Sequence, residues 1–131
     1  MQLSQNEYLI MQLLWREGRP LSRADLLNGT TGRNWNPASI HLILNSMLSK
    51  GAIKITDEEK KYGRTYEATI SQSEFILKCI DEGMPGWTQE EKTLSIMSAV
   101  LNRQDISEKE LDLLEDILAK RRKQICFKKK S

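Results

Sequence analysis

The stretch NPASIHLILNSMLSKG, residues 36–51, contains the start, the buried face and the end of one helix. Asn36 can cap this helix, and Pro37 suits its first position, where no amide hydrogen is needed. Gly51 can supply the left-handed backbone that ends it. Five apolar residues recur at helical spacing and predict one buried stripe: Ile40, Ile43, Leu44, Met47 and Leu48.

The opposite face of this helix carries short, mostly uncharged side chains: Ala38, His41, Leu42, Asn45, Ser46 and Ser49. Small side chains let a helix backbone approach another surface closely. We therefore expect this face to enter the major groove of double-stranded DNA. There Leu42 could meet a thymine methyl group, and Asn45 could pair with adenine or a phosphate.

Length and composition limit the possible classes of protein. A chain of 131 residues, 39% of them hydrophobic, forms one domain or two small ones with a modest core. No apolar run reaches the roughly 18 residues that a membrane span needs, and the first residues lack a secretory signal, so we expect a cytoplasmic protein that binds no membrane. Cys79 and Cys126 form no CxxC pair, so neither a disulfide nor a metal site is expected.

The net charge of +2 hides an uneven distribution of charged residues. Basic residues outnumber acidic ones nine to six over residues 1–64, whereas residues 65–119 hold twelve acids and four bases. The last twelve residues carry seven bases and no acid. This pattern predicts a mildly basic N-terminal half, an acidic C-terminal half and a basic tail, although ordinary solvated helix faces would also explain the acidic part.

Five pairs of residues have the spacing of a helix start, a hydroxyl residue followed three positions later by an acid. The hydroxyl can accept from an unpaired amide of the first turn, and the acid favours the positive end of the helix. The pairs are Ser4/Glu7, Ser22/Asp25, Ser71/Glu74, Thr88/Glu91 and Ser107/Glu110. Together with Asn36 they predict six helices.

The N-terminal half has the pattern of a helix-turn-helix. The first helix spans about residues 5–17, and its inward side chains are Leu9, Leu13 and Leu14. A short helix follows Ser22, and a polar loop then leads into the helix of residues 36–51. Two helices joined by a brief turn, the second exposing small polar side chains, are typical of DNA-binding helix-turn-helix proteins.

After Gly51 the apolar period changes from that of a helix to that of a strand. One short run alternates at Ile53 and Ile55, and a second at Tyr66, Ala68 and Ile70. Residues 57–64 between them can form the tip of a hairpin, which would serve as the wing of a winged helix. Its cations could reach DNA phosphates: Lys60, Lys61 and Arg64. The tip also carries Asp57, Glu58 and Glu59, which phosphates would repel, so a solvated loop tip remains an alternative.

The C-terminal half contains three amphipathic helices, at about residues 72–82, 89–103 and 108–123. Their apolar faces need partners, and pairing with the same helices of a second chain would bury them in a two-fold homodimer. The alternative is that they fold back on the N-terminal half. We expect the interface residues to be Phe75, Cys79, Leu94, Met97, Leu101, Leu111, Leu114 and Leu118.

These observations predict a mainly α protein with a small β-hairpin. Residues 1–71 would form a winged helix-turn-helix domain, and residues 72–125 a three-helix dimerisation region. Residues 126–131 would form a basic, disordered tail, although its lysines would also suit a helix end or contact DNA phosphates.

Several segments together resemble the penicillinase-repressor family of winged-helix transcriptional regulators. They are Met11–Trp15, the helix that follows Trp35 with Leu44 and Met47–Leu48, the pair Lys50–Gly51, the hairpin Tyr66, and the acidic last helix. The resemblance covers about residues 4–123. It implies a homodimer that binds a palindromic operator and represses transcription, often of antibiotic-resistance genes, with C-terminal helices that interlock.

The resemblance extends the expected DNA-reading set to Ala38, Ser39, His41, Leu42, Asn45 and Ser46. Family members usually carry threonine where Ser39 stands, a basic residue at His41, threonine at Leu42 and often arginine at Ser46. This helix is therefore poorer in charge, and its affinity would depend more on the wing and on Arg33. Residues 99–103 lack the Asn-Phe bond that is cleaved in family members released by proteolysis. The copper-responsive branch of the family has a cysteine cluster near its C-terminal end, and Cys126 alone does not form one.

The sequence offers no set of catalytic residues and implies no cofactor. Its only histidine, His41, has no serine–aspartate, paired-carboxylate or phosphate-loop pattern beside it. The competing interpretation is a winged-helix module that binds another protein, which Leu42 and the acids of the wing tip favour. A DNA-binding protein would lose affinity steeply as salt rises, whereas an apolar protein interface would not.

Overall fold

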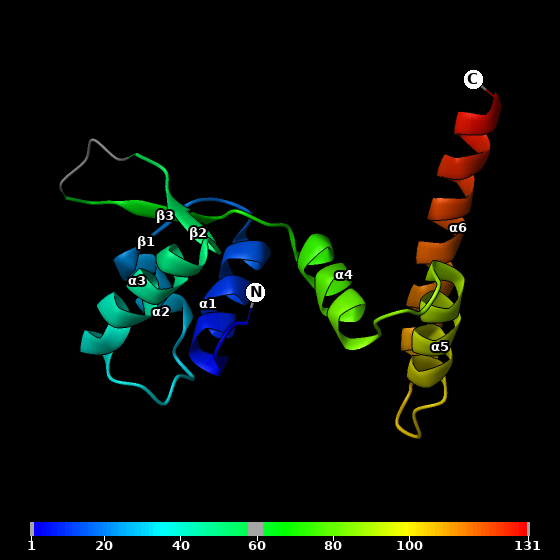
Figure 1. Ribbon diagram of the computed structural model, residues 1–131, viewed down its shortest axis with the longest axis horizontal. Coiled ribbons are helices and arrows are strands. Elements are labelled where there is room, and N and C mark those ends of the chain that lie inside the picture. Colours follow the sequence, from blue (N-terminus) through cyan, green and yellow to red (C-terminus); the bar gives the residue numbers. More distant parts are fainter. Residues whose placement is uncertain (1, 58–61, 131) are drawn as a thin grey trace. The chain divides into compact units, whose positions relative to one another are not determined.

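The computed structural model describes residues 2–57 and 62–130 (Figure 1). The chain forms two compact units, Met1–Asp81 and Glu82–Ser131. The elements, in order, are α1 (Gln5–Glu17), β1 (Leu21–Ser22), α2 (Arg23–Gly29), the 3-10 turn η1 (Pro37–Ser39), α3 (Ile40–Lys50), β2 (Ile53–Ile55), β3 (Thr65–Ala68), α4 (Gln72–Gly83), α5 (Gln89–Leu101) and α6 (Glu108–Lys130).

All five predicted helix starts are present. Full capping boxes form at Ser4, Ser22 and Thr88, where the hydroxyl accepts from the amide three residues on and the acid accepts from the cap amide. At α4 and α6, Ser71 and Ser107 accept from the corresponding glutamate amides at 3.1 Å. The residue spacing predicted these helix starts because each hydrogen bond joins two residues within one helical turn.

The helix of residues 36–51 has the predicted start, face and end. The Asn36 side chain accepts from the Ala38 amide at 3.0 Å, and η1 makes the first turn before α3 proper. Gly51 ends α3 with φ of 77°, a backbone conformation that favours glycine. The predicted stripe faces the core: Ile40, Leu44 and Met47 are buried, and Ile43 and Leu48 pack partly against them.

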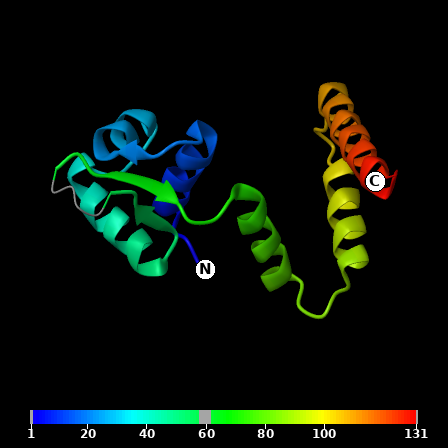
Figure 2. The same cartoon turned by 90° about the horizontal axis from the view of Figure 1, so that it is seen from above.

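The sheet has three antiparallel strands in the order β1-β3-β2, so the predicted hairpin gains a strand. Leu21 of β1 pairs with Tyr66, and Ile53 of β2 pairs with Ala68. The extra strand forms because the backbone before α2 is already extended where Ser22 caps the helix. Figures 1 and 2 show α1, α2 and α3 gathered around this sheet. The N-terminal unit is therefore a winged helix-turn-helix.

The core of this unit lies between α1, α3 and the sheet. Leu13 and Leu14 face it as predicted, but the prediction for Leu9 is wrong, since that side chain is 39% exposed. Ile10 and Met11 are fully buried instead. The physical reason is that α1 packs against both α3 and β3. Its buried face is the one turned toward these two elements, and Leu9 lies outside that face.

The C-terminal helices differ from the N-terminal unit in burial. No residue of α5 is buried, and none of the described side chains of α6 is. Helix α6 continues to Lys130, where the sequence predicted a disordered tail from residue 126. Lysines suit both the interior and the negative end of a helix, which accounts for the extension. Over the described residues, no helix is long and apolar enough to cross a membrane.

Candidate nucleic-acid interface

The outward face of α3 and η1 is open to solvent. Ala38, His41, Leu42 and Asn45 are exposed, and Leu42 is 74% exposed. The opposite face is held in the core by Ile40, Leu44 and Met47. A helix held along one side and bare along the other can place its exposed side chains against a flat or grooved surface.

Two of the predicted reading residues lie differently from the others. Ser39 and Ser46 are half-buried, and the Ser46 hydroxyl donates to Glu7 Oε2 of α1 at 2.9 Å. Ser46 thus belongs to the contact between α1 and α3 and is separated from the exposed face. Helical spacing alone did not reveal this, because Ser46 lies at the boundary of the buried stripe.

Glu7 connects the start of α1 to the end of α3. It is 3% exposed, and its carboxylate accepts from Lys50 Nζ at 2.6 Å, from the Ser4 amide at 2.8 Å and from Ser46. Burial alone would raise the pKa of Glu7, but the hydrogen bonds from Lys50, the Ser4 amide and Ser46 together lower it from 4.5 to about 2. The carboxylate is therefore ionised at neutral pH, and it compensates the charge of the one lysine of α3.

Arg33 is engaged within its own unit. Its Nη1 donates to the Leu27 carbonyl at 2.8 Å and to the Thr30 carbonyl at 3.0 Å, at the end of α2. Its guanidinium carbon lies 5.2 Å from the centre of the Trp35 ring. These contacts stabilise the loop that leads into η1. The predicted DNA contact by Arg33 would have to use a guanidinium nitrogen other than Nη1, or replace these bonds.

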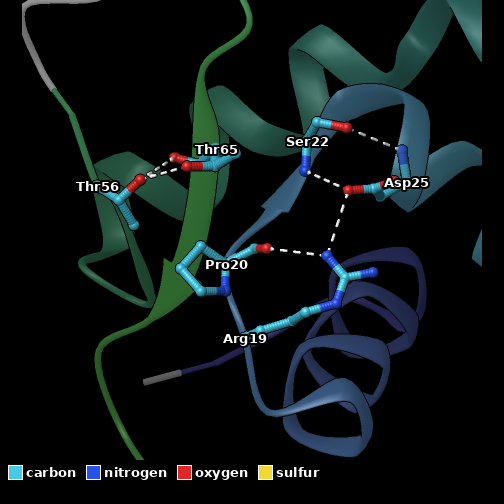
Figure 3. Close-up of polar contacts among 6 residues, drawn as sticks. All are labelled: Arg19, Pro20, Ser22, Asp25, Thr56 and Thr65. Carbon is cyan, nitrogen blue, oxygen red and sulfur yellow. Dashed lines mark hydrogen bonds and ion pairs between the residues drawn. The ribbon is translucent and has the colours of Figure 1, made fainter.

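The wing is only partly described. Lys60 and Lys61, two of its predicted phosphate-binding residues, lie outside the described residues. Arg64 is exposed. Thr56 and Thr65 fix the base of the hairpin: the Thr56 amide donates to the Thr65 carbonyl at 3.0 Å, and the Thr56 hydroxyl donates to the same carbonyl at 3.3 Å (Figure 3). The two threonine hydroxyls also hydrogen-bond to each other.

Sequence reasoning missed Arg23, the first residue of α2. Its Nη1 lies 3.0 Å from Nε2 of His41 on the exposed face of α3. An arginine can only donate, so His41 Nε2 accepts and the ring proton is on Nδ1. The signal available in the sequence was the position of Arg23 directly after the Ser22 cap, at the start of the first helix of a helix-turn-helix.

The start of α2 that carries Arg23 is well fixed. The Ser22 amide donates to Asp25 at 3.1 Å and the Asp25 amide donates to Ser22 Oγ at 3.1 Å (Figure 3). Arg19 pairs with Asp25 at 3.6 Å. The hydrogen bond from the Ser22 amide is the main cause that lowers the pKa of Asp25. Arg23 therefore projects from a rigid turn.

The predicted dimer residues fall into two groups. Phe75 is 8% exposed and packs against Tyr8 and Trp15 of α1, with ring centres 5.8 and 5.4 Å away, so it anchors α4 to the N-terminal unit. The others are exposed or half-buried: Cys79, Leu94, Met97, Leu101, Leu111, Leu114 and Leu118.

The three helices α1 to α3 and the β2–β3 hairpin define the class of this protein, the winged helix-turn-helix proteins. The chain belongs to the penicillinase repressor family, whose family model matches residues 3–120. This match confirms the family inferred from the sequence and supports a DNA-binding repressor of transcription. The family is one of regulators and not of enzymes.

Solved structures of other regulators are similar to this chain. MarR of Staphylococcus aureus, in complex with salicylate and kanamycin, is 9% identical over 94% of this chain and 73% of that chain, with a TM-score of 0.48. A mutant MepR from a multidrug-resistant S. aureus clinical isolate is 13% identical over 94% and 79%, with a TM-score of 0.46.

The ferric uptake regulator of Francisella tularensis, with iron, is 21% identical over 52% of this chain, with a TM-score of 0.44. The match spans about half of that regulator, 53% of its chain. A comparison with curated protein sequences found no match.

Proposed function

We propose that this protein is a sequence-specific repressor that binds a palindromic DNA operator as a homodimer. The observation that carries the proposal is the exposed, acid-free face of η1 and α3, formed by Ala38, His41, Leu42 and Asn45. The opposite side of α3 is fixed by the core and by the Glu7–Lys50 ion pair. Such a helix can enter the major groove without repelling the phosphates beside it.

Three exposed residues of α3 have partners on base edges. His41 accepts from Arg23 through Nε2, which leaves Nδ1–H as a donor for an acceptor such as guanine O6 or N7. Asn45 can pair with adenine, and Leu42 can contact a thymine methyl group. This set would read a short stretch of sequence in each half of the operator.

Ionic contacts with phosphates must come from residues outside α3, because its Lys50 is paired with Glu7. We assign this role to the wing, through Lys60, Lys61 and Arg64. Such contacts hold the protein in register on the duplex and carry no sequence information.

The dimer would form through the exposed apolar side chains of α5 and α6. Leu94 and Leu118 are 60% and 64% exposed, and Met97, Leu101 and Leu111 are exposed beside them along the same helices. Removing this surface from water is favourable at about 25 cal/mol per Å². A second copy of the chain presents the same surface, and two-fold pairing matches the symmetry of a palindrome.

We further infer that the regulated genes include antibiotic-resistance genes, as the family name suggests, and that the protein works in the cytoplasm beside its operator. Measuring transcript levels in a strain that lacks this protein tests the first inference. Resistance transcripts should rise in that strain.

The proposal is tested by gel retardation of a duplex that carries the upstream region of the protein's own gene. We expect retardation of this duplex at lower protein concentration than a random duplex of equal length. No retardation of either duplex at low salt would refute the DNA-binding function.

One observation favours a competing function, the binding of another protein. Leu42 is 74% exposed in the middle of the candidate reading face, and an apolar contact with a partner protein would remove it from water. Salt separates the two functions. Binding through several phosphate contacts weakens steeply between 50 and 200 mM salt, roughly a thousandfold, whereas apolar binding changes little.

A further inference from the structure

The exposed face of α3 has no cation of its own that is available to DNA. Lys50 is the only lysine or arginine of this helix, and it lies 2.6 Å from Glu7. Arg19 pairs with Asp25, and Lys54 pairs with Glu67 at 3.1 Å. A repressor that relied on α3 alone would therefore meet the phosphate backbone without a positive charge.

Arg23 supplies a charge to this face from the neighbouring helix. Its guanidinium touches His41 at 3.0 Å, and among the described residues no carboxylate lies within ion-pair distance of it. His41 is a neutral partner when its Nε2 accepts, so among the described residues none compensates the charge of Arg23. The guanidinium has five N–H donors, and the contact with His41 uses one of them.

Arg23 also lines a cleft. The cleft has a volume of about 380 Å³ and lies between the start of α2 and the wing, with Ser22, Tyr62 and Arg64 among its lining residues. Of the described residues that line it, two are arginines and none is acidic. The cleft is thus lined by Arg23, whose guanidinium also contacts His41 of the candidate reading helix.

We propose that Arg23 is a DNA-binding residue that holds a backbone phosphate in this cleft. The planar guanidinium fork matches a phosphate, which it can bind through two parallel hydrogen bonds. His41 orients the fork through its contact with Nη1. This inference rests on the proposed DNA-binding function and adds a contact that comes from α2, neither from the reading helix nor from the wing.

The test compares the wild-type protein with Arg23→Ala, Arg23→Lys and Arg16→Ala. Arg16 is an exposed arginine near the end of α1, so its replacement removes the same charge from a position away from the cleft. Binding is measured by fluorescence anisotropy over a series of KCl concentrations. The two labelled duplexes are one selected from a random pool and one of random sequence.

We expect Arg23→Ala to weaken binding to both duplexes by the same factor, roughly tenfold at low salt. The slope of log affinity against log salt should fall by about one unit per protomer. Arg23→Lys should keep the slope, because the charge remains. It should lose part of the affinity, because lysine lacks the planar guanidinium fork. Arg16→Ala should change neither quantity.

Three results would overturn the inference while the wild-type protein still binds DNA. They are an unchanged affinity and slope in Arg23→Ala, an equal loss in Arg16→Ala, and a loss confined to the selected duplex, which would indicate base reading. A wild-type protein that binds neither duplex would overturn the DNA-binding function itself. Thermal unfolding of each variant excludes loss of the fold, since Arg23 is exposed and its removal creates no cavity.

Discussion

The N-terminal unit, Met1–Asp81, buries its apolar side chains within itself, whereas α5 and α6 of the second unit leave theirs exposed. Ile10, Met11, Leu26 and Met47 are fully buried in the first unit. In α6, Leu118 is 64% exposed. The first region therefore has an apolar core of its own, and the exposed apolar side chains of the second are the reason we propose that a second copy of the chain covers them.

The strongest test of this contrast is Leu111→Asp in α6. A charge on the apolar face should prevent pairing of two chains and give a monomer. Because a single chain then engages one half of the operator, affinity should fall on the order of 10²–10⁴-fold. Light scattering gives the mass, and anisotropy gives the affinity.

The matched control is Leu113→Asp, which lies two residues further along α6 and about 200° around the helix. It should remain a dimer. A dimeric Leu111→Asp protein would refute the placement of the interface. If Leu113→Asp were then monomeric, the interface would lie on the other face of α6.

A second test compares the same substitution in the two regions. Leu44→Ala opens a cavity in the core of the N-terminal unit and should lower the free energy of unfolding by about 2–5 kcal/mol at any protein concentration. Leu118→Ala should cost stability only while chains are paired, so its effect should shrink on dilution. Urea unfolding at several protein concentrations measures both. Equal, concentration-independent losses would show that α6 packs within its own chain.

The third test concerns the ion pair that fixes α3 to α1. The pKa of Glu7 is about 2 in the folded protein and 4.5 without the fold, so the carboxylate contributes stability above pH 4.5. That contribution, on the order of 3 kcal/mol, should be lost as pH falls from about 4.5 to 2. Glu7→Gln should be less stable at neutral pH, and its free energy of unfolding should not fall by this amount between about pH 4.5 and 2. A Glu7→Gln protein with the wild-type pH profile of unfolding would contradict the assignment.

The smallest effects should distinguish the side of α3 that contacts α1 from its exposed face. Ser46→Ala removes a donor to Glu7 and should cost about 1 kcal/mol of stability with little change in sequence preference. His41→Ala should leave stability nearly unchanged and alter the preference at one base pair by about 1–2 kcal/mol. Unfolding curves and binding-site selection from a random pool measure the two quantities. A changed preference in Ser46→Ala would mean that this hydroxyl reads bases.

Local features of the fold were predictable from the sequence. The start of α1 follows from Ser4 and Glu7, and the limits of the helix at residues 36–51 follow from Asn36 and Gly51. Each of these contacts joins residues at most four positions apart, so it forms without help from the rest of the chain. The buried stripe of α3 was predictable for the same reason, because helical geometry alone puts its members on one side.

The candidate site depended on contacts that no local pattern contains. Ser46 meets Glu7 across 39 positions of sequence, and Arg23 meets His41 across 18. Whether residues so far apart in sequence come into contact depends on how the helices cross. The same crossing placed Ser46 in the contact between α1 and α3 and brought Arg23 to the reading face, and neither result is visible in a helical repeat.

The sequence by itself therefore determined where the helices begin and end, which side of α3 is apolar, and the family to which the chain belongs. Only the tertiary structure decided which polar residues of the unit face solvent, that Arg33 is engaged at the end of α2, and that Phe75 packs against Trp15. The physical reason is the range of the interactions. Caps and apolar periods are complete within a few residues, whereas a side chain's partners are known only when distant helices have packed.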